Sequence, residues 1–253
     1  MTYISGKWHL SNNVRSPDEA WPMRRGFDHH YGNMNGATSY FFPTCMFRDE
    51  IDIESEAKNN PDFYYTDAIS DHACGFIKDH FQETPSQPMF MYVAYTCPHW
   101  PLHAKPFDIA KYKGRFDEGW DRLRERRLER LQKMKILDEK WLLTPREPVA
   151  DDWEEVDEKE WWLRRMEVYA AQIDCMDQGI GRIVSELKHA NQFENTLIIF
   201  ISDNGATREE ILGHPQTQMV EKGVARGMTR DGRPVIHGNT EEIMPGSEDT
   251  HQS

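Results

Sequence analysis

The chain has 253 residues, of which 38% are hydrophobic and 29% are charged, as is usual for a globular protein with a wet surface. Its net charge of −13 argues against nucleic acid as a partner, because that binding depends on neutralising phosphates with Lys and Arg. No apolar run approaches the ~20 residues of a membrane-spanning helix, and no signal peptide is visible. The four cysteines are far apart, without metal-ligand spacing, so we expect buried thiols.

The first predicted strand is short and ends near Ser5, followed by Gly6-Lys7-Trp8-His9-Leu10. Alternate residues of an extended backbone point to the same side, so Lys7 and His9 would lie together while Trp8 faces away. A cation beside an imidazole can hold an oxyanion and transfer a proton. A surface lysine next to an incidental histidine is the alternative interpretation.

The next segments alternate between loops and one helix. Residues 12–22 and 41–60 show no steady hydrophobic period and are predicted to be irregular. The adjacent His29 and His30 would face opposite sides of an extended backbone, which favours packing over a shared metal. Apolar residues recur at helical spacing from Thr66 or Asp67 to about Glu83, which predicts a helix with one buried face.

A second strand is expected at residues 89–95, where an unbroken apolar run predicts burial on both faces. It ends at Thr96-Cys97-Pro98-His99-Trp100-Pro101. The two prolines restrict the backbone on either side of His99, so a stiff loop would present its imidazole. Packing of His99 against Trp100 is the alternative, and we expect His103 to be structural.

The second half of the chain is predicted to contain two amphipathic helices and a polar tail. Residues 106–160 form a highly charged helical and loop region, in which an exposed helix carries an apolar edge from Trp120 to Met134. Residues 160–190 predict a long helix with a continuous buried stripe, in which Gly179 and Gly181 would allow close packing. Residues 207–253 are predicted to be a polar irregular tail.

The apolar run Leu197–Ile201 is the third predicted strand, again buried on both faces. It is followed directly by Ser202-Asp203-Asn204-Gly205. Ligands of open α/β sheets bind just beyond the carboxyl ends of the strands. Asp203 and Asn204 would deliver two hard oxygen ligands there, the kind that Ca²⁺ or Mg²⁺ takes. A simple turn is the alternative, since Asp, Asn and Gly are common in turns.

The order of these segments, with GKWH, TCPHWPLHA and ISDNGA each at the end of a strand, resembles the type I sulfatases of the alkaline phosphatase superfamily, and arylsulfatases in particular. Arg25–Gly32 is similar to their RGFD-x-x-YG stretch. The resemblance extends from Ile4 to about Ala206. It implies an α/β fold with a largely parallel central sheet flanked by helices, of which residues 1–253 would form an incomplete catalytic domain.

The resemblance also implies roles for individual residues. Lys7 matches the lysine that contacts the sulfate and the nucleophile, and His9 matches the histidine that hydrogen-bonds the nucleophile. His99 matches the histidine near the leaving-group oxygen, a substrate-binding residue and general-acid candidate. Asp203 and Asn204 match the late metal ligands, with Ca²⁺ expected more than Mg²⁺.

The sequence departs from the family pattern at both ends. Sulfatases use a formylglycine made from Cys or Ser in a C/S-x-P-S-R motif, and none of the four cysteines lies in such a motif. The early acidic metal ligands are also absent, and the chain ends before a second catalytic lysine. We therefore expect an internal portion of a sulfatase, with formylglycine in a segment outside this chain and no turnover by these residues alone.

The expected substrate is a sulfated small molecule or a sulfated glycan. The resemblance favours a periplasmic or secreted parent protein. Two alternatives stay open from the sequence: a phosphodiesterase or phosphonate hydrolase of the same superfamily, with a different nucleophile, and a non-catalytic module.

Overall fold

A computed structural model describes residues 1–148, 150–205 and 246. Its sheet has five strands in the order β4-β3-β2-β1-β5. β1 pairs in parallel with β2 on one side and with β5 on the other, and the remaining two pairings are antiparallel. The strands are β1 (Thr2–Gly6), β2 (His29–Asn33), β3 (Met46–Arg48), β4 (Ile51–Asp52) and β5 (Phe90–Ala94).

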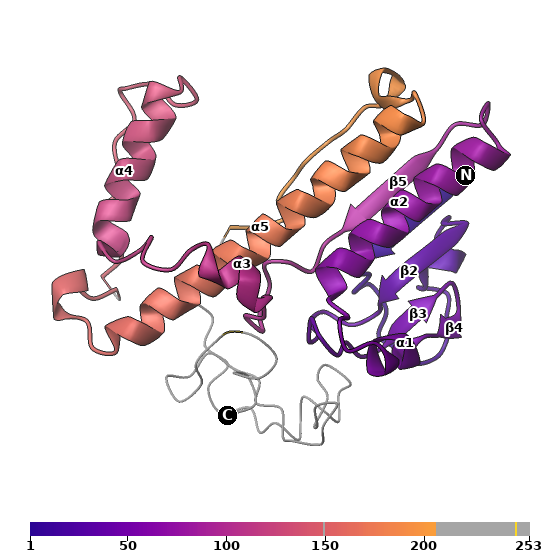
Figure 1. Cartoon of the computed structure of the whole chain (residues 1–253), viewed down its shortest axis with the longest axis horizontal. Helices are drawn as coiled ribbons and strands as arrows, with labels where there is room; N and C mark the ends of the chain where they lie inside the picture. The colour runs from indigo at the N-terminus through magenta and orange to yellow at the C-terminus, as the bar shows by residue number, and fades with distance from the viewer. Residues whose placement is uncertain (149, 206–245, 247–253) are drawn as a thin grey trace.

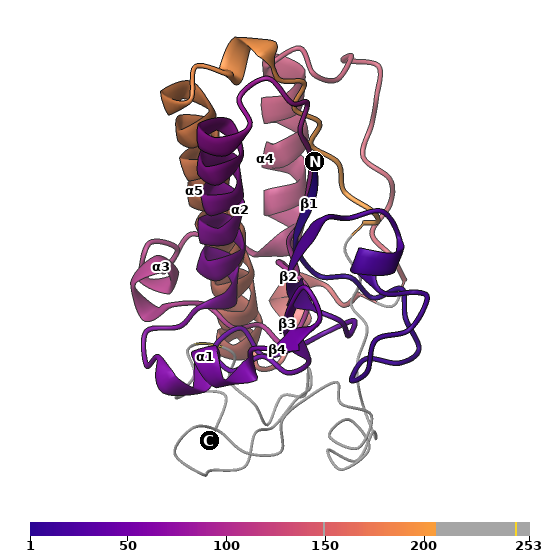
Figure 2. The same ribbon diagram turned by 90° about the vertical axis from the view of Figure 1, so that its right-hand side faces the viewer.

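One long helix packs against a face of this sheet, and a second long helix lies alongside the first (Figures 1 and 2). They are α2 (Tyr65–Glu83) and α5 (Lys159–His189), close to the helices that the hydrophobic spacing predicts. The segment around the 3₁₀ helix η1 (Pro22–Arg24) covers the opposite face (Figure 2). The other helical elements are α1 (Glu54–Asn59), α3 (Pro106–Ala110), α4 (Gly119–Lys133), η2 (Trp153–Glu155) and η3 (Phe193–Asn195).

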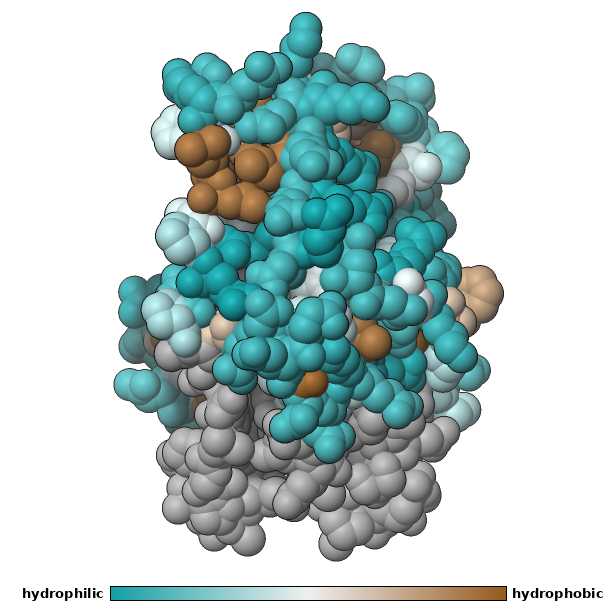
Figure 3. All heavy atoms as spheres, turned by 90° about the vertical axis from the view of Figure 1, so that its left-hand side faces the viewer, coloured by the Kyte–Doolittle hydropathy of each residue, from teal (hydrophilic) through white to brown (hydrophobic). Residues whose placement is uncertain are grey.

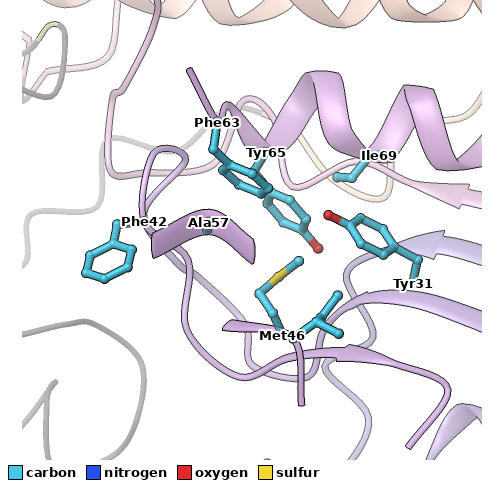
Figure 4. Close-up of a cluster of buried hydrophobic side chains, with 8 residues drawn as sticks. Tyr31, Phe42, Met46, Ala57, Phe63, Tyr65 and Ile69 are labelled. Atoms are coloured by element: carbon cyan, nitrogen blue, oxygen red, sulfur yellow. The ribbon is translucent and has the colours of Figure 1, made fainter. Parts of the chain in front are cut away.

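The core between α2 and the sheet is aromatic and includes a buried polar link (Figure 4). Tyr65 and Tyr31 pack with Met46 and Ile69 in one buried cluster. The Tyr65 hydroxyl donates to Asn33 Oδ1 at 2.7 Å and accepts from the Asn33 backbone N–H at 2.8 Å. A buried tyrosine of this kind packs its ring and satisfies its hydroxyl at once, so it fixes the carboxyl end of β2 to the first turn of α2.

Residues 41–60, predicted to be irregular, contain β3, β4 and α1, so that prediction is wrong. Strands of two or three residues are too short for a period of two to become visible in the sequence. Met46 and Phe47 are nevertheless 2% and 3% exposed, because β3 adds to the free edge of β2.

Burial on both faces is wrong for the other two predicted strands. β5 forms, but Phe90 and Tyr92 are 60% and 48% exposed, because β5 is an edge strand of the described sheet. Residues 197–201 are extended without pairing to any strand among the described residues, and all five side chains are between 49% and 85% exposed. An apolar run indicates a buried strand only when the neighbours that would bury it are present.

The charged region forms α4, which stands away from the sheet, as expected for an exposed amphipathic helix (Figure 1). The face on that side is mostly hydrophilic, with a hydrophobic patch near one end and scattered hydrophobic residues elsewhere (Figure 3). None of the helices in the described part of the chain combines the length and apolarity of a membrane span.

The predicted tail at 207–253 lies outside the described residues except for Gly246, whose carbonyl accepts from the Ala104 N–H at 3.1 Å.

The cysteines are free thiols, as expected. Cys45, Cys97 and Cys175 are buried and Cys74 is partly buried. Burial raises the pKa of the Cys175 thiol to about 12, which keeps it protonated and unreactive at neutral pH.

Candidate active site at the carboxyl ends of β1 and β5

β1 and β5 end at the same level of the sheet, which brings their following loops together. Gly6 is the register partner of Ala94, and the Lys7 N–H donates to the Ala94 carbonyl at 2.8 Å. Gly6 has a φ of +126°, and a Cβ there would lie 2.0 Å from the Ala94 oxygen. Only glycine allows the two backbones to approach so closely, so this position sets where Lys7 leaves the sheet.

Lys7 is partly buried at this edge. Burial lowers the pKa of its ammonium group, because removing water disfavours the charged form, and the negative charge of Asp203 acts in the opposite direction. The structure therefore brings Lys7 within electrostatic reach of Asp203, although 195 positions separate the two along the sequence.

His9 follows in the left-handed backbone region, with a φ of +58°. Its N–H donates to the Met34 carbonyl at 3.2 Å, which ties the segment to the loop after β2. Burial lowers the pKa of the His9 imidazole, and the positive charges of Lys7 and His99 lower that pKa further. His9 is thus a neutral base at neutral pH, with the Lys7 ammonium group and the His99 imidazole near it.

His99 is held from three directions. Its Nδ1 lies 2.8 Å from the Trp100 carbonyl oxygen, its N–H donates to Thr96 O at 2.9 Å, and the Tyr40 hydroxyl donates to the His99 carbonyl at 2.8 Å. A carbonyl can only accept, so Nδ1 carries the hydrogen in that contact and Nε2 is the nitrogen that gains or loses a proton. This is the tautomer that a general acid acting through Nε2 requires.

His103, which the sequence predicts to be structural, is 2% exposed. The Tyr40 N–H donates to its Nδ1 at 3.3 Å, and its carbonyl accepts from the Tyr64 hydroxyl at 2.9 Å. These contacts fix the loop after β5 against the aromatic residues that precede α2.

Asp203 and Asn204 are exposed at the end of the 197–201 run. The Ser202 hydroxyl donates to the Asn204 carbonyl at 2.7 Å, and Asn204 Nδ2 donates to the Gly205 carbonyl at 2.9 Å. The carboxylate and carboxamide oxygens suit Ca²⁺, but Ca²⁺ takes about six to eight oxygens. Among residues 1–148 and 150–205 no three His, Cys, Asp or Glu side chains gather into a metal site. The described residues thus supply part of a coordination shell.

Four of the five predicted site residues are therefore linked by their charges: Lys7 to Asp203, and His9 to Lys7 and His99. Asn204 adjoins Asp203 in the sequence. Sequence reasoning missed Gly36, which lies directly against the His9 ring. Asn35-Gly36 is a pair typical of turns, which predicts a turn there without indicating what packs on it.

Comparison with known proteins places these residues in a family. The Sulfatase family model matches residues 1–238. An uncharacterized sulfatase of Schizosaccharomyces pombe is 33% identical over 222 residues, which cover 81% of this chain and 38% of that protein. The arylsulfatase of Klebsiella aerogenes is 33% identical over 215 residues, covering 81% of this chain and 44% of that enzyme.

The solved structure of Ps i-CgsB in complex with k-i-k-neocarrahexaose is 21% identical with a TM-score of 0.48, over 77% of this chain and 35% of that one. The chain spans about two fifths of the length of the two curated relatives. The match over residues 1–238 and the mixed sheet with flanking helices, in which β1 pairs in parallel with both of its neighbours, agree with the predicted fold class. The chain belongs to the sulfatase family.

Proposed function

We propose that this chain forms the central part of a sulfuric ester hydrolase of the arylsulfatase type, which cleaves sulfate monoesters. The observation that carries the proposal is the electrostatic coupling of Lys7, His9, His99 and Asp203 at one edge of the sheet. These residues come from three segments that are far apart in the sequence. A set of cationic and proton-transferring groups at strand ends suits an anionic ester.

Each residue has a role that its surroundings support. The Lys7 ammonium group would bind an equatorial sulfate oxygen, where negative charge is present throughout the reaction. His9, neutral at neutral pH, would accept a hydrogen bond from the attacking nucleophile. His99, with Nδ1 held by the Trp100 carbonyl, would deliver a proton from Nε2 to the leaving oxygen.

Two groups complete the proposal from outside the described residues. Asp203 and Asn204 would hold a divalent cation, for which Ca²⁺ is the first choice, together with ligands from other segments. Such a cation, when bound, stabilises negative charge on the sulfate oxygens. A formylglycine supplied by a segment outside residues 1–253 would be the nucleophile, since no cysteine of this chain lies in the required motif.

The direct test is to read the coding sequence upstream of Met1 and to assay the longer protein with an aryl sulfate. We expect an in-frame C/S-x-P-S-R motif and hydrolysis that falls by roughly 100-fold or more in Lys7→Ala, as for loss of one charge-stabilising donor. An exposed-lysine variant, Lys58→Ala, serves as the matched control. A Thr or Ser nucleophile without that motif, and faster cleavage of phosphate diesters, would instead identify a phosphodiesterase.

The isolated chain gives a second test. We expect residues 1–253 to show no turnover of an aryl sulfate above the Lys7→Ala background. Activity clearly above that background would show that the nucleophile is already present in this chain.

A further inference from the structure

We propose that Gly36 is a positioning residue that seats the imidazole ring of His9. The inference rests on the proposed function only where it gives the seated His9 ring a role in catalysis. The contact itself is a property of the chain and can be tested without activity.

The His9 ring lies directly over Gly36. A Cβ built on Gly36 would be 2.4 Å from both Cε1 and Nε2 of His9, and 2.9 Å from Nδ1. Carbon atoms in contact are normally about 3.5–4.0 Å from their neighbours. Any other residue at this position therefore has to push the ring aside. The three contacting atoms include both ring nitrogens, so such a displacement moves the atoms that would carry out the chemistry.

The loop under the ring is held by buried hydrogen bonds, so the ring yields before the loop does. Asn33 Nδ2 donates to the Asn35 carbonyl at 2.6 Å and to Asn35 Oδ1 at 2.8 Å. Asn35 Nδ2 donates to the Thr44 hydroxyl at 3.0 Å. Asn33 is in turn bonded to Tyr65 in the aromatic core. All four residues are buried, which makes the loop a rigid platform.

His9 also has a backbone conformation that favours a specific side-chain direction. Its φ of +58° is uncommon for a residue with a side chain and persists only when the surroundings hold it. The hydrogen bond from the His9 N–H to Met34 O and the ring contact with Gly36 act on the same residue from the same loop. Together they fix both the backbone and the ring of His9 relative to β2.

The test is the titration of His9 by NMR in the 253-residue chain. In Gly36→Ala we expect the pKa of His9 to rise toward the ordinary value of about 6.5, because the displaced ring loses burial and moves away from the Lys7 and His99 charges. Gly75→Ala is the matched control, since a Cβ at Gly75 meets nothing within 4 Å. An unchanged His9 titration and ring environment in Gly36→Ala would overturn the proposal.

A second variant keeps the proposal testable if Gly36→Ala does not fold. In His9→Ala/Gly36→Ala the ring that the methyl group would strike is gone. We expect the double variant to fold with the thermal midpoint of His9→Ala. A double variant that remains unfolded would show that the methyl group collides with something other than His9, and the proposal would be wrong.

Activity of the longer protein then separates this inference from the proposed function. If Gly36 acts only through His9, Gly36→Ala lowers kcat, and adding it to His9→Ala causes no further loss. If His9→Ala itself retains full activity, the proposed role of His9 fails while the NMR result on Gly36 stands. Additive losses in the double variant would contradict the positioning role.

Discussion

At the scale of single residues, the candidate site brings the partly buried Lys7 near the exposed His9, and both are groups that can carry a positive charge. The pKa values of Lys7 and His9 are both lowered, first by burial and then, for His9, by neighbouring cations. A negative charge bound between these two groups would favour their protonated forms and so offset the lowering of both pKa values.

We therefore expect inorganic sulfate to raise the pKa of His9 by roughly half a unit to one unit, as an interaction of about 1 kcal/mol between partly exposed charges would do. Since sulfate favours the protonated form, its affinity should increase as pH falls through the pKa of His9. NMR titration in sodium sulfate, compared with sodium chloride at equal ionic strength, measures both effects. Identical pKa values in the two salts would contradict the anion site.

Substitution of Lys7 tests whether the sulfate that raises the pKa of His9 binds at this site. In Lys7→Met the sulfate-induced shift should shrink, because one of the two cations near the anion is lost. Lys58→Met removes an exposed lysine of α1 and should leave the shift unchanged. Equal loss in both variants would indicate general screening rather than binding at this site.

At the scale of elements, the contact between α2 and α5 depends on one of two nearby glycines. A Cβ at Gly179 would lie 2.1 Å from the Ser70 hydroxyl oxygen and 2.9 Å from the Tyr95 hydroxyl, which are bonded to each other at 2.7 Å. A Cβ at Gly181 meets nothing within 4 Å. The prediction that both glycines allow close packing is thus confirmed for Gly179 and wrong for Gly181.

These two positions give opposite expectations for the same substitution. Gly179→Ala should destabilise the protein by about 1–3 kcal/mol through overpacking. Gly181→Ala should stabilise it by up to about 1 kcal/mol, because alanine is the better helix former. Denaturant unfolding of the two variants measures both changes. Similar changes in both variants would show that α5 does not pack on α2 in this register.

The helices and strands differ in how far the sequence predicts them. Helix bounds are predicted well, whereas the burial of the apolar runs is not. Helical spacing over long segments predicts α2 and α5 to within a few residues, since many positions contribute to the pattern. The runs at 89–95 and 197–201 are equally clear as patterns, yet their burial depends on which neighbours cover them. The spacing of apolar residues predicts which face of a segment is apolar. It does not predict whether another element packs against that face.

The candidate site was also predicted only in part from the sequence. Lys7, His9 and His99 follow strand ends, where general rules for α/β sheets place ligands, and the resemblance to sulfatases supplies their predicted roles. Gly36 could not be selected in this way, because its contact with His9 joins two loops whose approach depends on the register of β1 and β2.

The exposed run at 197–201 leads to a prediction for the chain in solution. Five adjacent apolar side chains, in a segment that pairs with no strand in the part of the chain that the structure describes, are a template for association. We expect the 253-residue chain to self-associate at micromolar concentration and Ile199→Asp to reduce that association. Ile51→Asp, which changes a single exposed isoleucine in β4, is the control. Light scattering over a concentration series measures the effect, and equal association of all three chains would rule it out.

At the scale of the whole molecule, two neutral histidines make stability depend on pH. His30 is fully buried in β2, and among the described residues neither ring nitrogen has a hydrogen-bond partner. Burial lowers the pKa of His30 to about 4, partly opposed by Asp49. His72 stacks on Tyr31 with ring centroids 3.5 Å apart, and burial lowers its pKa to about 4 as well. Both imidazoles therefore take up a proton in the folded chain only near pH 4, well below the ordinary histidine pKa of about 6.5.

The sign of the effect follows from proton linkage. Between pH 6.5 and pH 4 the unfolded chain binds protons at these histidines and the folded chain does not, so the free energy of unfolding falls as pH falls. For His30 the full loss is about 3 kcal/mol, reached near its folded pKa. His30→Gln should flatten this dependence more than His29→Gln, a substitution at the partly exposed neighbour in β2. Denaturant midpoints measured at pH 7, 5.5 and 4.5 test the difference. Parallel curves for wild type and His30→Gln would show that this buried imidazole does not control the acid response of the fold.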